Sequence, residues 1–196
     1  MKYSLSLFFV LLLAIMATTS EAGGQSKWGV DCRPSLNIPT KLFNGSKLEP
    51  GFGFDIGVTY NVIGNAAIFG GWGWTLFPQN KTDGNAMNVE KMGSDVGIKY
   101  TQPLNNFNLA YFVKGGAMYQ HIKVEKATEK RFNSGQEWGW QIESGLSLPL
   151  DPNISLEPGL KYTSLSGIIR QDGSEKDFQL NDLSAGIILS IKIGRQ

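Results

Sequence analysis

Cysteine, histidine and net charge are scarce in this chain of 196 residues, and each shortage excludes a class of protein. The single cysteine, Cys32, excludes a framework of intramolecular disulfides and is expected to be a small buried apolar side chain, with a free reactive thiol as the alternative. One histidine, His121, and one remote cysteine supply none of the usual metal-ligand spacings, so we expect no metal and no cofactor. A formal net charge of +1 offers no electrostatic case for binding nucleic acid.

Long hydrophobic runs are confined to the start of the chain. A short positive start precedes an almost entirely apolar stretch over residues 5–17, and the small residues that signal peptidase reads follow at Ser20 and Ala22. This stretch is shorter than the ~20 residues of a membrane-spanning helix. We therefore predict a signal peptide over residues 1–22 and one exported domain over residues 23–196, without a spanning helix.

Alternation of apolar and polar residues is what the chain has in quantity. In the clearest run, 137–148, every second residue from Trp138 is apolar apart from Ser144, and the residues between are polar or glycine. A period of two predicts a strand with one face in apolar surroundings. About eight such strands are expected, the first of them disturbed by Pro34: 28–33, 52–62, 68–76, 91–100, 109–120, 137–148, 154–162 and 182–193.

The segments between the predicted strands are alternately long and short. Long polar loops are expected at 41–50, 78–88, 121–135 and 171–176, and tight turns at 64–65, 103–106 and 151–153. Outer-membrane barrels have this asymmetry, with long extracellular loops and short periplasmic turns. An even number of strands places both ends of the barrel on the periplasmic side.

The apolar faces carry aromatic rings near the strand ends and aliphatic residues between them. The rings expected toward the extracellular rim are Phe52, Phe54, Trp72, Trp74, Tyr119, Trp138, Trp140 and Tyr162. Those expected toward the periplasmic rim are Trp28, Tyr60, Tyr100 and Tyr111. Two aromatic girdles around an aliphatic band are typical of a transmembrane β-barrel, because amphipathic rings favour the headgroup level.

The polar faces are rich in glycine and carry charges of both signs in the middle of the strands. The charges are Asp95, Lys99, Lys114, Glu143, Glu157 and Lys161. The interior of an eight-stranded barrel is only wide enough for side chains to fill, and buried charges must pair. We predict a structural network of interior charges that closes the barrel, with the lining of a pore as the alternative.

In its leader, its strand patterns and its final strand, the chain resembles the small eight-stranded outer-membrane barrels of Gram-negative bacteria, the OmpA/OmpX-type and opacity-like porin family. The resemblance implies an all-β fold, an eight-stranded antiparallel up-and-down transmembrane barrel in the bacterial outer membrane. The chain departs from the family pattern in ending Ile193-Gly194-Arg195-Gln196 rather than in an aromatic residue. It also places Pro158 within a strand, where we expect a local bulge.

The resemblance implies a non-enzymatic protein with a structural, adhesive or narrow-pore role, in contact with outer-membrane lipids and with its specificity in the extracellular loops. The charges of the 121–135 loop are expected to form a solvated surface, with contact to lipopolysaccharide or a host surface as the alternative. Two other classes stay open: a soluble exported lipocalin-like binder of a small apolar ligand, and a lipid A-modifying enzyme. His121 is followed by Ile122-Lys123 and lacks the His-x-Ser arrangement of the deacylases, so no catalytic residue is predicted.

Overall fold

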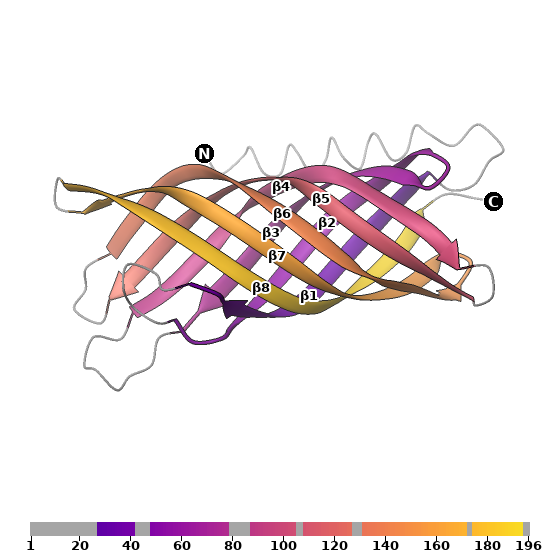
Figure 1. Cartoon of the computed structure of the whole chain (residues 1–196), viewed down its shortest axis with the longest axis horizontal. Helices are drawn as coiled ribbons and strands as arrows, with labels where there is room; N and C mark the ends of the chain where they lie inside the picture. The colour runs from indigo at the N-terminus through magenta and orange to yellow at the C-terminus, as the bar shows by residue number, and fades with distance from the viewer. Residues whose placement is uncertain are drawn as a thin grey trace.

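Eight antiparallel strands close into one barrel, in which each strand pairs with its neighbours in sequence and β8 pairs with β1 (Figure 1). The computed structural model describes residues 27–41, 48–78, 87–104, 108–126, 131–171 and 174–193. The strands are β1 (Trp28–Pro39), β2 (Gly51–Ile63), β3 (Ala66–Phe77), β4 (Met87–Leu104), β5 (Leu109–Lys126), β6 (Arg131–Asp151), β7 (Ile154–Gln171) and β8 (Ser174–Ile193). The predicted fold class is confirmed.

Some predictions fall on residues outside these ranges. They include the signal peptide over residues 1–22 and the charged loop residues Glu129 and Lys130. Within the described ranges, the chain forms no helix that is long and apolar enough to cross a membrane.

Burial alternates along the strands as strictly as the sequence does. In β1 the inward Arg33 and Asn37 are 3% and 2% exposed, whereas the outward Leu36 and Ile38 are 65% and 53% exposed. The same pattern leaves the aliphatic and aromatic residues of the other strands on the outer surface. A soluble lipocalin-like barrel has its apolar face inside, around the ligand. The structure therefore contradicts that alternative, because here the apolar face covers the outside.

The β5–β6 hairpin is longer than predicted. Strand pairing continues to Glu125 and Arg131, so most of the predicted 121–135 loop is paired strand, interrupted by one register shift near Ile122. The prediction ended the strands where charges begin. The structure extends the strands because Ile122 and Val124 occupy inward positions of β5 and bury their side chains inside the barrel.

The prolines disturb the strands less than predicted. Pro34 lies within β1 opposite Phe54, and the strand continues to Pro39. The bulge expected at Pro158 is absent: Pro158 lies opposite Ile187, and the β6–β7 register is the same on both sides of it. A proline whose side chain faces outward lacks a backbone N–H for strand pairing. This does not require a bulge when the residue pairs on both sides of the proline keep the register.

The loop-side end of the barrel contains an apolar cluster on the inner face. It comprises Leu48, Phe77, Val89, Ile122, Val124, Leu165, Phe178 and Leu180. Leu48 comes from the segment between β1 and β2, and the backbone N–H of the next residue, Glu49, donates to the carbonyl of Pro78. The opposite end has tight turns, including Gly64 at φ 48°, a conformation that favours glycine.

Candidate functional site in the barrel interior

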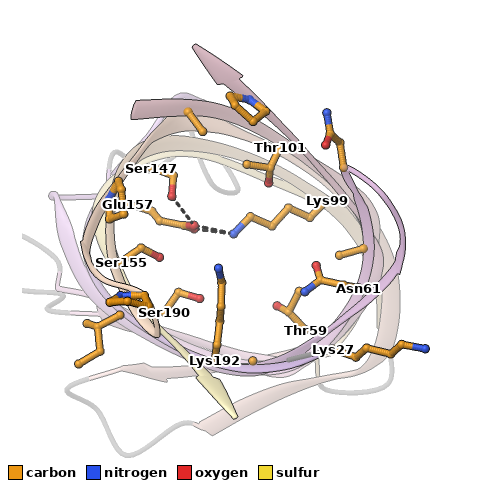
Figure 2. A pocket seen from close by; sticks show the side chains of 18 of the residues that line it. Lys27, Thr59, Asn61, Lys99, Thr101, Ser147, Ser155, Glu157, Ser190 and Lys192 are labelled. Carbon is orange, nitrogen blue, oxygen red and sulfur yellow. Dashed lines mark hydrogen bonds and ion pairs between the residues drawn. The ribbon is translucent and has the colours of Figure 1, made fainter. Parts of the chain in front are cut away.

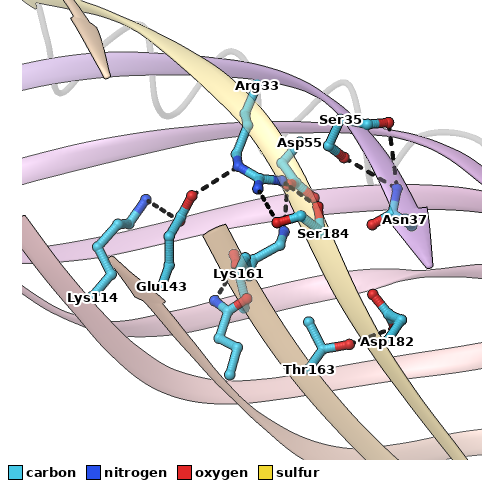
Figure 3. Close-up of polar contacts among 12 residues, drawn as sticks. Arg33, Ser35, Asn37, Asp55, Lys114, Glu143, Lys161, Thr163, Asp182 and Ser184 are labelled. Atoms are coloured by element: carbon cyan, nitrogen blue, oxygen red, sulfur yellow. Dashed lines mark hydrogen bonds and ion pairs between the residues drawn. The ribbon is translucent and has the colours of Figure 1, made fainter. Parts of the chain in front are cut away.

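Arg33 lies at the centre of a network of charges inside the barrel (Figure 3). Its Nε is 2.8 Å from Glu143 Oε1, and its Nη1 is 3.3 Å from Asp55 Oδ2. Nη1 also donates to Ser184 Oγ at 3.0 Å. The guanidinium thus joins β1 to β2, β6 and β8. Arginine suits this buried position because its guanidinium carries several hydrogen-bond donors.

Lysines complete this central network. Lys161 of β7 pairs with Asp55 of β2 across the lumen, and Lys114 Nζ is 3.8 Å from Glu143 Oε2. Lys114 also lies over the ring of Phe69, 4.6 Å from its centroid. Glu143 is buried, and each of its two carboxylate oxygens lies near a cation from a different strand, Arg33 of β1 and Lys114 of β5. Such an arrangement lowers the cost of keeping a carboxylate away from water.

Asp95 differs from the other five residues of the predicted charge network. Its Oδ2 accepts a hydrogen bond of 2.6 Å from Gln141 Nε2, and it forms no ion pair with any residue that the structure describes. The amide of Gln141 is itself buried. A hydrogen bond from a neutral amide, rather than an ion pair with a cation, thus links Asp95 to the same interior layer.

A second layer lies toward the turn side. Lys99 of β4 reaches Glu157 of β7, with 2.8 Å to Oε1 and 2.6 Å to Oε2, and Ser147 Oγ donates to Glu157 Oε1 at 3.1 Å. Lys99 Nζ also lies 5.1 Å from the centroid of the Phe112 ring. The pair is buried, so the carboxylate and ammonium satisfy each other away from bulk water.

A third layer lies toward the loop side and was missed by the charge network proposed from the sequence. Lys91 Nζ is 2.5 Å from Asp182 Oδ2 and 3.0 Å from Thr163 Oγ1, and the Thr163 hydroxyl donates to the same Asp182 oxygen. Both charged residues stand on the inner faces of their strands. Alternation alone could have placed them there, but it does not reveal that they meet.

Together these layers fill the middle of the lumen. A cavity of about 30 Å³ lies there, bordered by Arg33, Asp55, Glu143 and Lys161 among others. A volume of this size holds roughly two or three water molecules. The apolar cluster closes the loop-side end beyond it. The described interior is therefore packed with paired polar side chains at this level and with apolar side chains beyond it toward the loop side.

The predicted aromatic residues all stand on the outer face. Three contacts join them in pairs: Trp28 with Tyr60 at 4.7 Å between centroids, Tyr119 with Trp138 at 4.9 Å, and Trp140 with Tyr162 at 5.5 Å. Most of the others are well exposed: Phe52, Trp72, Tyr100 and Tyr111.

Two outer tryptophans differ in their position along β3. Trp74 lies near the loop-side end and donates from Nε1 to Glu90 Oε1 at 2.5 Å. Trp72 lies at the centre of the strand, opposite Ile56 and Ser94. The rings toward the loop side thus cover a range of heights on the barrel wall rather than one level.

The two residues considered for reactive chemistry lie in ordinary surroundings. His121 is half-buried opposite Met92 and Gln136. Cys32 is a free, half-buried thiol on the outer face of β1, so the prediction of a buried side chain is wrong: the residue alternates outward with Val30. Among the described residues, no group of three or more histidine, cysteine or acidic side chains could hold a metal ion.

Comparison with known proteins agrees with this geometry. The chain matches the family model described as "Outer membrane protein beta-barrel domain" over residues 7–187. A search of curated proteins found no match.

Solved structures of small outer-membrane barrels share the fold. Neisserial surface protein A is 17% identical, with a TM-score of 0.60, and the match covers 85% of this chain and 97% of that chain. OprG of Pseudomonas aeruginosa is 11% identical, with a TM-score of 0.60 and coverage of 88% and 99%. Ail of Yersinia pestis, solved in complex with the heparin analogue sucrose octasulfate, is 12% identical, with a TM-score of 0.53 and coverage of 86% and 100%.

Proposed function

The chain belongs to the family of outer membrane protein β-barrel domains, and on that premise we propose that it is a non-enzymatic barrel, closed to solutes, whose specificity lies in its extracellular loops. The observation that carries the proposal is the filled lumen. Arg33, Asp55, Glu143 and Lys161 meet around a space of about 30 Å³. A wall that is apolar outside and ion-paired inside suits a protein that is anchored in a membrane and displays its loops.

Outer-membrane lipids are the partners of the outer surface in this proposal. The exposed aliphatic band of residues such as Val96, Ile142 and Ile187 would contact acyl chains. The aromatic residues above and below this band would lie at the two headgroup levels, where amphipathic rings are favoured. The signal peptide predicted over residues 1–22 would deliver the chain to the envelope.

Conductance across planar lipid bilayers tests the closed lumen. The refolded chain should insert without producing current steps. A variant with Arg33→Ala, Asp55→Ala and Glu143→Ala should raise the ion current, because three long side chains leave the narrowest layer. Glu90→Ala, on the outer face, serves as the control and should produce no current steps. Steady current from the unmodified chain would contradict the proposal.

Adhesion is the form of loop function that one observation favours. Ail, which has the same fold, was solved with a heparin analogue. In this chain the β5–β6 hairpin carries the charges of the longest predicted loop: Lys123, Glu125, Lys126, Glu129, Lys130 and Arg131. We infer that this hairpin contacts a polyanionic surface such as lipopolysaccharide or a host polysaccharide. Binding of the refolded chain to immobilised heparin, and its loss after replacement of the four basic residues by serine, measures this directly.

A lipid A-modifying enzyme is the competing class. His121 has Gln136 and Met92 as strand neighbours, and no serine follows it in the spacing of the deacylases. Mass spectrometry of lipid A from cells with and without the gene separates the two classes. An altered lipid A that is restored by the intact chain, and not by a His121→Ala variant, would refute the non-enzymatic proposal.

A further inference from the structure

The turn-side end of the barrel holds a cavity of about 1040 Å³ (Figure 2). It opens at the end with the short turns, which is the periplasmic end in proteins of this family. The space exists because the inward positions at this end are occupied by small residues: Gly29, Ala67, Ala110, Ser155 and Ser190. At the loop-side end the equivalent inward positions carry bulky residues such as Phe77, Ile122 and Leu165. The chain thus fills one end of its lumen and leaves the other open.

The cavity has a polar floor. The buried pair of Lys99 and Glu157, with the Ser147 hydroxyl, closes it toward the middle of the barrel. Beside this floor, the Thr59 hydroxyl donates to Asp31 Oδ2 at 2.7 Å. A molecule that enters from the turn side therefore meets a dead end rather than a channel.

One of the ammonium groups in the cavity has no partner among the described residues. Lys99 is neutralised by Glu157, whereas the side chain of Lys192 projects into the space (Figure 2) and has no hydrogen bond or ion pair with any described residue. Asp151 at the rim accepts the backbone N–H of Asn153 within its own turn. Lys27 also borders the rim but points away from the space (Figure 2). One free ammonium group thus stands in the cavity, whose walls combine the hydroxyl groups of Thr101, Ser155 and Ser190 with apolar residues, and the Asp151 carboxylate lies at the rim.

We propose that this cavity binds a small polyhydroxylated organic anion, of the sugar-acid class, from the periplasmic side. The carboxylate of such a molecule would pair with Lys192, and its hydroxyl groups would exchange hydrogen bonds with Thr101, Ser155 and Ser190, which border the space. The cavity is at the upper end of the size of small-molecule sites, which run to about 1000 Å³. This site is independent of the closed-lumen proposal, because it requires no passage through the barrel.

Titration of the full folded chain in lipid nanodiscs tests the site, with gluconate as the probe and calorimetry and amide NMR as the readouts. Glucose lacks the charge of gluconate, and propionate lacks its hydroxyl groups. Gluconate should bind about tenfold more tightly than either, because the charge-assisted contact and the hydroxyl contacts act together. The amide signals of Ser190 and Lys192 should shift.

Lys192→Met should weaken gluconate binding by about tenfold. Lys27→Met removes the same charge from the rim and should leave the affinity unchanged. Ser155→Phe should fill the space and abolish binding, with heat-modifiable migration on gels as the check of folding for every variant. Equal affinity for gluconate and glucose, an equal loss in the two lysine variants, or no binding of gluconate would overturn the proposal.

Discussion

Lys91 on β4 and Asp182 on β8, on opposite sides of the barrel, meet through the lumen with 2.5 Å between Nζ and Oδ2. Asp182 is fully buried, and Thr163 donates a further hydrogen bond to the same oxygen. Contacts of this kind hold opposite walls at a fixed distance. Such contacts form only in the closed barrel, because they join strands that are not neighbours in the sheet.

Removal of one member of this pair should be strongly destabilising. Asp182→Asn leaves the Lys91 ammonium buried without a counter-charge, which should lower the free energy of unfolding by about 3–5 kcal/mol. Urea titration of tryptophan fluorescence in liposomes measures the change. Lys123→Met breaks the partly exposed pair with Glu90 at 4.0 Å, and should cost about 0–1 kcal/mol. Similar losses in the two variants would show that burial does not strengthen the interior pair.

Two adjacent glycines of β5 should respond in opposite ways to alanine. Gly116 faces inward, and a Cβ there would collide with the carbonyl oxygen of Val96 and lie 3.0 Å from the Cα of Gly97. Gly115 faces outward, and a Cβ there meets nothing within 4 Å. Gly116→Ala should lower stability by about 1–3 kcal/mol, as overpacking does. Gly115→Ala should be neutral or slightly stabilising in the same urea titration, and the reverse order would contradict the assigned faces.

A charge on the outer face should cost more in the middle of a strand than near its end. Val96 is 59% exposed at the middle of β4, and Asn88 is outward on the same strand near the loop side. If the outer band lies in lipid, Val96→Lys should cost about 2–4 kcal/mol and Asn88→Lys about 0–1 kcal/mol. Folding yield and urea midpoint in liposomes measure both. Equal tolerance at the two positions would argue that Val96 faces water.

Tryptophan quenching should report the depth of individual rings. Single-tryptophan variants that retain Trp72 or Trp138 are reconstituted with brominated lipids. Trp72 lies at the centre of β3, so bromines near the acyl-chain ends should quench it most. Trp138 lies nearer the loop side of β6 and is 66% exposed, so bromines near the headgroup should quench it most. A lack of quenching by any lipid-confined bromine would contradict the lipid-facing assignment of the outer wall.

The sequence allowed the strands and their faces to be predicted, because side-chain direction in a strand alternates with a period of two. Lys99, Glu143 and Lys161 could be assigned to the interior by this rule. Which of these charges pair could not be predicted, since alternation carries no information on which distant strands face each other. Alternation also assigns Arg33 and Asp55 to inward positions, yet the predicted charge network omitted both, although they lie at its centre.

The ends of the strands were also beyond the sequence pattern. The charged residues after His121 are typical of a loop, yet the β5–β6 hairpin continues because Ile122 and Val124 find an apolar cluster inside the barrel. The register around Pro158 is likewise maintained by pairs on both sides of it. Tertiary contacts outweigh the local preference for a loop where continued strand pairing buries apolar side chains.

By itself, the sequence determined a barrel wall with an apolar outer face and a polar inner one, because each residue's face follows from its position in the alternation. Only the tertiary structure decided that Lys91 meets Asp182, that Arg33 joins Glu143 and Asp55, and that one end of the lumen is filled and the other open. These features depend on the closure and register of eight strands. They bring together residues far apart in the chain at distances that no local pattern encodes.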